Sequence, residues 1–524
     1  MSQAQEKHKV ARAAGVVGAA TLASRVAGFV RDLVIAYFFG AGPAADAFFV
    51  AFRIPNLLRR LFAEGTLTIA FIPVFTELLR TRGRREALLL ARSTLGLLAL
   101  ALLVVCAAGI VWAPEVVRVM APGFTPGGES YRLAVTLTRW CLPYIFFVSL
   151  TALAAGVLNS LDHFFAPAAS PVLLNLSLIT CAVALAPRVD PPVMSLALGV
   201  ILGGAAQLLL QVPFLRARGV SLRPAWQPRN PALRRVLRLM LPAAFGAAVY
   251  QLAVFINTVL ASLLPTGSVS YLYYADRLIE FPLGIFAIAV STAILPSLSR
   301  QAADHDHRAL VETLGYGLRL SLFINLPAMV GLMVLARPLV LLLFTRGRFG
   351  PAAAQATAAA VVGYGVGLWA FAGVRAVVAA FYALKDTRTP VVVAAGCLVI
   401  NLALSLALMG PLRHVGLALA TSAASAANLA GLLWLLRRRL GPLGLRGLAA
   451  SCGRMLLASG VMGLVVLAVC HLLPWGGADS LTRRLARPLA AVLCGAGVYL
   501  ALARLMRLPE LNELAQVLRR RAKP

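Results

Sequence analysis

Apolar runs of about 20 residues recur along almost the whole chain, separated by short connections. Such a run crosses the hydrocarbon core of a bilayer as one α-helix, whereas the strands of a membrane β-barrel would alternate in segments of about 10 residues. The chain is 60% hydrophobic and only 13% charged, against about 25% charged in a typical soluble domain. The sequence therefore predicts an all-α polytopic membrane protein.

The apolar runs predict about 14 transmembrane helices. Several runs exceed the length needed to cross, so we expect those helices to tilt, bend or project from the bilayer. The predicted spans lie near 14–38, 44–79, 88–113, 133–158, 166–186, 192–215, 235–263, 270–299, 309–336, 352–383, 389–409, 414–436, 448–472 and 488–506.

The basic residues are unevenly distributed between the two sides of these spans. The formal net charge is +30, and most Lys and Arg residues lie in the two tails and in alternate connections, such as 80–85 and 216–238. Because positively charged connections stay on the cytoplasmic side, both termini are predicted to be cytoplasmic. The concentration of Lys and Arg on the cytoplasmic side accounts for the high net positive charge, so we expect no nucleic-acid partner.

An internal duplication is visible at a nearly constant separation of 223 to 226 residues. Six spans per copy would make the two copies enter the membrane in the same direction, which is a parallel repeat. We predict lobes at 1–230 and 231–440, followed by two extra spans and a cytoplasmic tail in 441–524. The matching pairs are Pro73 with Pro296, Pro114 with Pro338, Pro167 with Pro390, and Asn175 with Asn401.

Charged side chains concentrate inside the first two predicted spans and recur in the eighth. A charge at the bilayer centre costs roughly 2.5–3.5 kcal/mol, so a cluster of charges favours a water-filled or substrate-filled cavity. The alternative is that they reach the head-group boundary or form structural ion pairs, which we expect for single arginines such as Arg319. In the eighth span, Arg277 and Glu280 are three residues apart and share a helix face.

The basic members of this cluster suit an anionic ligand. Guanidinium groups bind phosphate oxygens bidentately and stay charged at any working pH. We expect three arginines to converge on one anion, with Gly28 permitting the first helix to bend beside it. Nearby carboxylates would hold the arginines or form a gate. The three arginines are Arg25, Arg31 and Arg277, and the carboxylates are Asp32, Asp46, Glu64 and Glu280.

Two long stretches carry a family resemblance. The run from Ser24 to Leu79, "SRVAGFVRDLVIAYFFGAGPAADAFFVAFRIPNLLRRLFAEGTLTIAFIPVFTELL", resembles the signature of the MviN/MurJ family, and so does "YYADRLIEFPLGIFAIAVSTAILPSLS" from Tyr273 to Ser299. These are bacterial lipid II flippases of the MOP exporter superfamily. The resemblance implies a two-lobed bundle in the cytoplasmic membrane that moves the undecaprenyl-pyrophosphate-linked peptidoglycan precursor to the outer leaflet. It also implies a membrane-facing groove in the last two spans that suits the long prenyl tail. Whether the cell-wall synthesis machinery contacts the protein stays open at the level of the sequence.

The resemblance also implies site residues. Helical phase from Arg53 favours Arg60 on its face, whereas the family match favours Arg59, and Pro55 disturbs the phase. Some family members bind sodium through carboxylates in the seventh and eleventh spans, but 235–263 and 389–409 contain no Asp or Glu, so we expect no such site. The implied positions are Arg25, Arg31, Asp46, Arg53, Arg59, Glu64, Asp276, Arg277 and Glu280.

Other function classes fit the residues less well. A membrane-embedded transferase would want a metal site or catalytic base, yet the six histidines fall in tails, connections or span edges without a DxD or HExxH motif. We therefore expect a transporter without cofactor or metal. A multidrug or cation antiporter would want acidic residues to dominate the cavity. That antiporter, or a flippase for another polyprenyl-linked glycan in the same superfamily, is the alternative.

Overall fold

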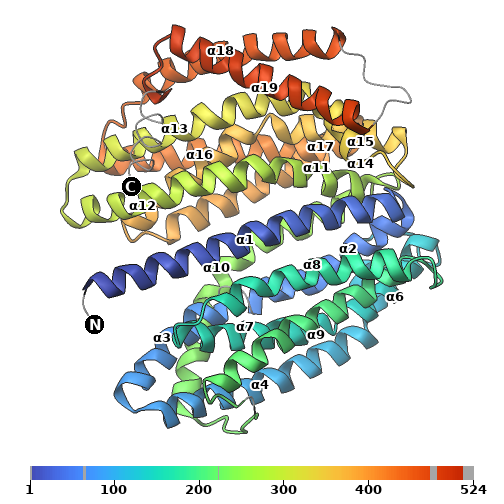
Figure 1. Ribbon diagram of the computed structural model, residues 1–524, viewed down its shortest axis with the longest axis vertical. Helices are drawn as coiled ribbons and strands as arrows, with labels where there is room; N and C mark the ends of the chain where they lie inside the picture. Colours follow the sequence, from blue (N-terminus) through green and yellow to red (C-terminus); the bar gives the residue numbers. More distant parts are fainter. Residues whose placement is uncertain (1–2, 63–65, 222, 473–480, 512–524) are drawn as a thin grey trace. The chain divides into compact units, whose positions relative to one another are not determined.

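The computed structural model describes all residues except 1–2, 63–65, 222, 473–480 and 512–524, and the regular structure in the described part of the chain is helical (Figure 1). The chain divides into two compact units. The first unit contains residues 1–270 together with Arg346–Phe349, and the second contains 271–345 and 350–524. The prediction of an all-helical membrane protein is confirmed at this level.

The first unit is built from ten helices within its described residues. The helices are α1 (Gln3–Phe39), α2 (Pro43–Phe62), α3 (Thr66–Thr81), α4 (Arg84–Val111), α5 (Ala113–Met120), α6 (Glu129–Cys141), α7 (Tyr144–Ser160), α8 (Phe165–Leu185), α9 (Met194–Ala217) and α10 (Pro231–Ser262).

The second unit contains nine α-helices and a π-helical turn within its described residues, and its first helix begins in the last residues of the first unit. These elements are α11 (Ser268–Pro282), the π-turn η1 (Leu283–Ala287), α12 (Ile288–Ala303), α13 (His307–Val334), α14 (Ala336–Phe344), α15 (Pro351–Gly365), α16 (Leu368–Ala383), α17 (Arg388–Leu440), α18 (Leu445–Leu472) and α19 (Leu481–Leu505).

Nine helical stretches in the described residues are long and apolar enough to cross a membrane, or ten if the bent pair α15 and α16 forms one span. One of the nine is α17, whose 53 residues would extend about 80 Å, far beyond the about 30 Å of a hydrocarbon core. Arg413 has a positive φ of 49° and interrupts α17. The chain therefore bends between the two predicted spans 389–409 and 414–436.

The helices that carry the charged cluster, α1 and α2, are not among the nine apolar stretches. The charged residues of α1 and α2 lower the mean hydropathy of these helices. The same charged residues make the two helices candidates for lining a cavity. Two long predicted spans are also divided. The stretch 133–158 breaks between α6 and α7 at Leu142 and Pro143, and 352–383 bends by 43° between α15 and α16.

Several helix boundaries recur along the chain at a separation of 223 positions. Helix α13 begins at His307 and ends at Val334, in each case 223 positions after the matching end of α4. The starts of α5 and α14, the ends of α7 and α16, and the starts of α8 and α17 keep the same separation. Asp162 and Lys385, also 223 apart, both have a φ of 59°.

Each unit has its own apolar core. In the first, Phe71 and Phe75 of α3 pack with residues of α4, α7 and α10. In the second, α18 and α19 pack against α13 through a core that includes Phe323 and Met455, and the Tyr499 hydroxyl donates to the Phe323 carbonyl at 2.9 Å. The outer faces of α18 and α19 expose leucines such as Leu464, which suits contact with lipid.

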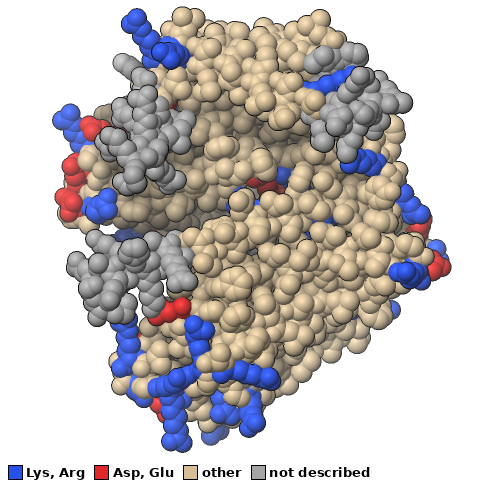
Figure 2. All heavy atoms as spheres, in the orientation of Figure 1, with Lys and Arg blue, Asp and Glu red and all other residues tan. Residues whose placement is uncertain are grey.

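Basic side chains gather at the ends of helices rather than along their length. Figure 2 shows Lys and Arg over the end of the first unit where α3 leads into α4, whereas most of the visible surface between the helix ends carries no charge. Arg80, Arg82, Arg84 and Arg85 are all exposed there. This distribution is typical of connections that stay in the cytoplasm.

Candidate functional site

Arg31 lies at the centre of a polar contact between α1 and α8. Its Nε and Nη2 donate to Oδ1 of Asp32 at 3.0 and 2.7 Å, and its Nη1 donates to Oδ1 of Asn175 at 3.0 Å. Asn175 in turn donates to the Ser24 carbonyl at 3.1 Å. The Arg31 side chain is 12% exposed and that of Asp32 1%. Breaking this pair would therefore remove a countercharge from a buried carboxylate.

Arg25 differs from Arg31 in its surroundings. It lies on the exposed surface of α1, six residues before Arg31. Helix α1 continues without a break through Gly28, and a β-carbon there would lie 3.5 Å from Nδ2 of Asn175. Gly28 thus permits the close approach of Asn175, while Arg25 presents an exposed cation within an otherwise apolar helix segment.

Asp46 lies in the first turn of α2 and is 2% exposed. Its Oδ2 accepts from the Gly267 amide at 2.6 Å, and its Oδ1 accepts from the amide and hydroxyl of Ser270 at 2.9 and 2.5 Å. These donors belong to the start of α11, where backbone amides lack helical partners. The carboxylate therefore caps this helix start, where a negative charge is favoured.

The remaining predicted residues of α2 are only partly described. Nη1 of Arg53 donates to the Thr258 hydroxyl of α10, and Thr258 is completely buried. Arg59 is half-buried. Glu64 and the side chain of Arg60 lie outside the described residues, so the choice between Arg59 and Arg60 stays a prediction.

In the second unit, the three predicted residues lie on α11. Nη1 of Arg277 donates to Oε2 of Glu280 at 2.6 Å, and the guanidinium carbon lies 4.8 Å from the centre of the Tyr273 ring. The pair was predicted from its spacing, and its side chains are 32% and 50% exposed. Asp276 is half-buried beside it. The π-helical turn η1 follows directly, and such turns often accompany functional sites.

A comparison with models of protein families shows which family the chain belongs to. The family model described as lipid II flippase MurJ matches residues 35–485. The chain belongs to the MurJ family. A "Lipid II flippase MurJ" of Burkholderia cenocepacia is 41% identical over 434 residues, covering 82% of this chain and 84% of that protein. A "Probable lipid II flippase MurJ" of Vibrio cholerae is 40% identical over 425 residues, covering 79% and 80%.

Solved structures agree with MurJ membership. A structure described as lipid II flippase MurJ in an inward closed conformation superimposes with a TM-score of 0.79 at 25% identity, covering 94% of this chain and 98% of that one. An inward-facing MATE multidrug transporter of the MOP superfamily gives a TM-score of 0.70 at 16% identity, covering 82% and 99%. At that identity the MATE match reports the shared fold alone. The prediction of a transporter family is confirmed.

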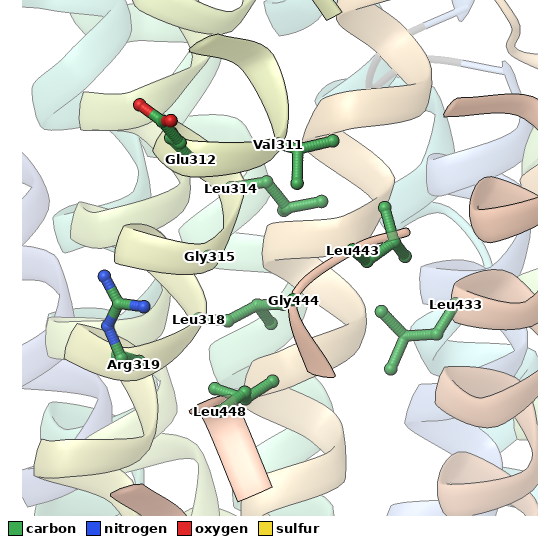
Figure 3. A pocket seen from close by; sticks show the side chains of 10 residues that line it. All are labelled: Val311, Glu312, Leu314, Gly315, Leu318, Arg319, Leu433, Leu443, Gly444 and Leu448. Carbon is green, nitrogen blue, oxygen red and sulfur yellow. The ribbon is translucent and has the colours of Figure 1, made fainter. Parts of the chain in front are cut away.

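The second unit contains a cavity whose lining includes none of the predicted site residues. It has a volume of about 340 Å³ and is formed by α13, the end of α17 and the start of α18. Figure 3 shows Glu312 and Arg319 on one side of α13, with Gly315 between them and leucines facing the cavity. Nε of Arg319 lies 3.6 Å from Oε1 of the fully buried Glu510. Arg319 thus helps to fix the segment after α19, which fits its predicted packing role.

Two polar residues that contact the predicted site arginines were not themselves predicted as site residues. Asn175 holds Arg31, and Thr258 accepts from Arg53. Asn175 served only as a marker of the duplication, although a lone amide in an apolar span is itself a signal of a buried polar contact. Thr258 gives no such signal, because threonine commonly bonds to its own helix backbone.

The described residues contain no group of three His, Cys, Asp or Glu side chains close enough to hold a metal ion. Helices α10 and α17 contain no Asp or Glu at all. The carboxylate ligands that a sodium site of the family type would use are therefore missing from the sequences of these two helices.

Proposed function

We propose that the protein flips lipid II from the inner to the outer leaflet of the bacterial cytoplasmic membrane. The observation that carries this proposal is the match to the MurJ family over residues 35–485, supported by relatives of about 40% identity that bear the name of lipid II flippase. The MATE resemblance is confined to the fold at 16% identity. We therefore prefer the flippase to the antiporter.

We further propose 14 spans in two parallel six-helix repeats, with two extra helices at the C-terminal end. Helix boundaries that recur at a separation of 223 residues support the repeat, and the break of α17 at Arg413 supports two spans there. The lobes would be 1–230 and 231–440, with accessory spans in 441–524. The exposed basic connection at 80–85 supports cytoplasmic termini.

For the substrate site, we propose that the pyrophosphate engages Arg25, Arg31 and Arg277 in the course of the transport cycle. The Arg277 pair with Glu280 is half exposed, and such pairs contribute only about 0.2–1 kcal/mol. A pyrophosphate with several charged oxygens would displace the Glu280 carboxylate at little cost. Arg53 and Arg59 would extend the cationic surface, and Asp32, Asp46, Glu64, Asp276 and Glu280 would form the ion pairs of the gate.

Complementation tests the function. A bacterial host depleted of its own lipid II flippase should regain growth when this gene is the sole replacement. Liposomes that contain the purified protein should move lipid II across the bilayer, and protein-free liposomes should not. Good membrane expression without growth and without transport would contradict the proposal.

Alanine variants test the site. Arg25→Ala and Arg277→Ala should nearly abolish transport with normal membrane abundance, since each removes a charge-assisted contact of about 1.5–3 kcal/mol. Arg→Lys should rescue only in part, because the ammonium lacks the bidentate fork. Arg82→Ala, in an exposed connection, is the matched control and should transport normally.

Arg31→Ala should behave differently, because it also removes a countercharge from the buried Asp32. We expect lower thermal stability as well as lost transport. Adding Asp32→Asn should restore stability but not lipid II binding. Normal lipid II binding and transport in Arg25→Ala, Arg31→Ala and Arg277→Ala would refute the anion site.

A further inference from the structure

The first unit contains an apolar cavity of about 450 Å³ between α2, α4, α5 and α10. Only one lining residue, Glu115 in the first turn of α5, carries a charge. The other lining residues are Ile54, Leu57, Leu58, Val105, Gly109, Val116, Val119, Met120, Leu142 and Phe255.

The cavity ends beside a cation of the proposed site. Leu57, which lines it, lies four residues after Arg53 in α2, so the two side chains share a helix face. Phe255, which lines it from α10, lies three residues before Thr258, and Thr258 accepts a hydrogen bond from Arg53. Three residues are about one helical turn, so the Arg53 guanidinium and the apolar wall are neighbours on both helices.

The cavity is also open to the surroundings of the unit. Val105 on α4 is 37% exposed and Val119 on α5 is 62% exposed, so a chain in the surrounding lipid has direct access to the lining. Helix α5 lies in a connection that the charge distribution assigns to the outer side of the membrane. Apolar walls next to a guanidinium on this side suit an amphiphile with an anionic head and a hydrocarbon tail.

We infer that this cavity holds part of the polyprenyl chain of the substrate after its head group has reached the outer side. The inference rests on the proposed flippase function and adds a tail-binding site beside Arg53. The exposed Val105 and Val119 edges let the chain pass into the outer leaflet on release.

Two adjacent valines on α4 provide a matched test. Val105 lines the cavity, whereas Val104 is 60% exposed and lies outside its lining. Val105→Trp should fill the cavity, while Val104→Trp adds the same side chain to the lipid-facing surface. The probe is a lipid II analogue with a photoreactive diazirine in its prenyl chain, added to liposomes that contain the full-length protein.

We expect wild-type protein and Val104→Trp to be labelled on α4 and α5. Val105→Trp should reduce this labelling about tenfold, which corresponds to about 1.4 kcal/mol of lost affinity, because the indole occupies the space of the prenyl chain, and should slow flipping. Equal labelling of the two variants would overturn the inference. So would equally strong labelling by a photoreactive phospholipid that lipid II does not displace, because an ordinary acyl chain would then be the occupant.

Wild-type transport separates this inference from the proposed function. If wild-type protein moves no lipid II, the flippase proposal fails, and the tail site fails with it. If wild-type and Val105→Trp proteins transport and label alike, only the tail site fails. Membrane abundance and thermal unfolding of both tryptophan variants check that neither change acts through folding.

Discussion

Asp46 is almost completely buried, and its carboxylate accepts three hydrogen bonds from Gly267 and Ser270. The sequence predicted a buried charge here but not its partners. Gly267 lies 221 residues away, and helical periodicity carries no information at that distance. By contrast, Arg277 and Glu280 are three residues apart, and their pairing was predicted because one helix fixes the geometry of both.

Asp46→Asn should destabilise the start of α11. The amide keeps one acceptor but turns donors toward the backbone amides, so we expect a loss of roughly 1–3 kcal/mol in the free energy of unfolding. Thermal unfolding in detergent measures it. Glu77→Gln is the control, because the Glu77 pair with Arg235 is about half exposed and such pairs contribute less than about 1 kcal/mol. Equal shifts for the two variants would refute the capping role.

Asp386, in the connection between α16 and α17, provides a pH-dependent contact. Hydrogen bonds from the Thr389 amide, then from the Thr389 hydroxyl and Arg439, hold the pKa of this carboxyl below its ordinary value of 3.8. A lowered folded-state pKa stabilises the protein above the unfolded-state pKa, and the stabilisation is lost as the pH falls through the folded-state pKa.

We therefore expect Asp386→Asn to unfold at a lower temperature than wild type at neutral pH. The difference should shrink as the pH falls from 3.8 through the lowered folded-state pKa, because the wild-type carboxylate then becomes protonated as well. Thermal unfolding of both proteins across an acidic pH series measures this. A difference that stays constant down to the lowest pH would exclude the carboxylate charge as its cause.

At the scale of elements, long apolar runs were predicted well because length and composition are local properties. Breaks within runs were predicted less well. Pro143 signals the break between α6 and α7, but the bend before α16 depends on Gly367, where a β-carbon would lie 2.6 Å from the Ser422 hydroxyl. Such an approach depends on a residue far along the chain, so no local pattern reports it.

The connection between α1 and α2 contains a similar close approach. Gly40 has a φ of 66°, and a β-carbon there would lie 2.5 Å from the Arg348 carbonyl oxygen. The Arg348 amide donates to the Tyr37 carbonyl at 2.9 Å. Gly40→Ala should weaken this contact, since both the backbone conformation and the added atom are unfavourable.

Hydrogen exchange measures the effect of Gly40→Ala. The Arg348 amide should exchange faster in this variant than in wild type. Gly42→Ala is the matched control, because nothing lies within 4 Å of a β-carbon at Gly42. Unchanged exchange in Gly40→Ala, or the same increase in both variants, would argue against the contact.

At the scale of the whole molecule, composition was enough to establish the membrane class, because burial in lipid constrains every segment of the chain. The duplication was predicted from proline and asparagine positions, and helix boundaries recur at the same separation of 223 residues. The predicted lobe boundary at 230 stays a prediction. Within the first unit, which extends to Ser270, α10 packs against α3 through the core that includes Phe71.

The segment Arg346–Phe349 belongs to the first unit, although the chain on either side of it belongs to the second. When a chain passes from one unit to the other only once, a cut at that linker gives two polypeptides that each contain one entire unit. Here a cut after Ser270 would leave Arg346–Phe349 on the wrong polypeptide. The Tyr37 carbonyl and the Arg348 amide, which are hydrogen-bonded in the intact chain, would then belong to two separate polypeptides.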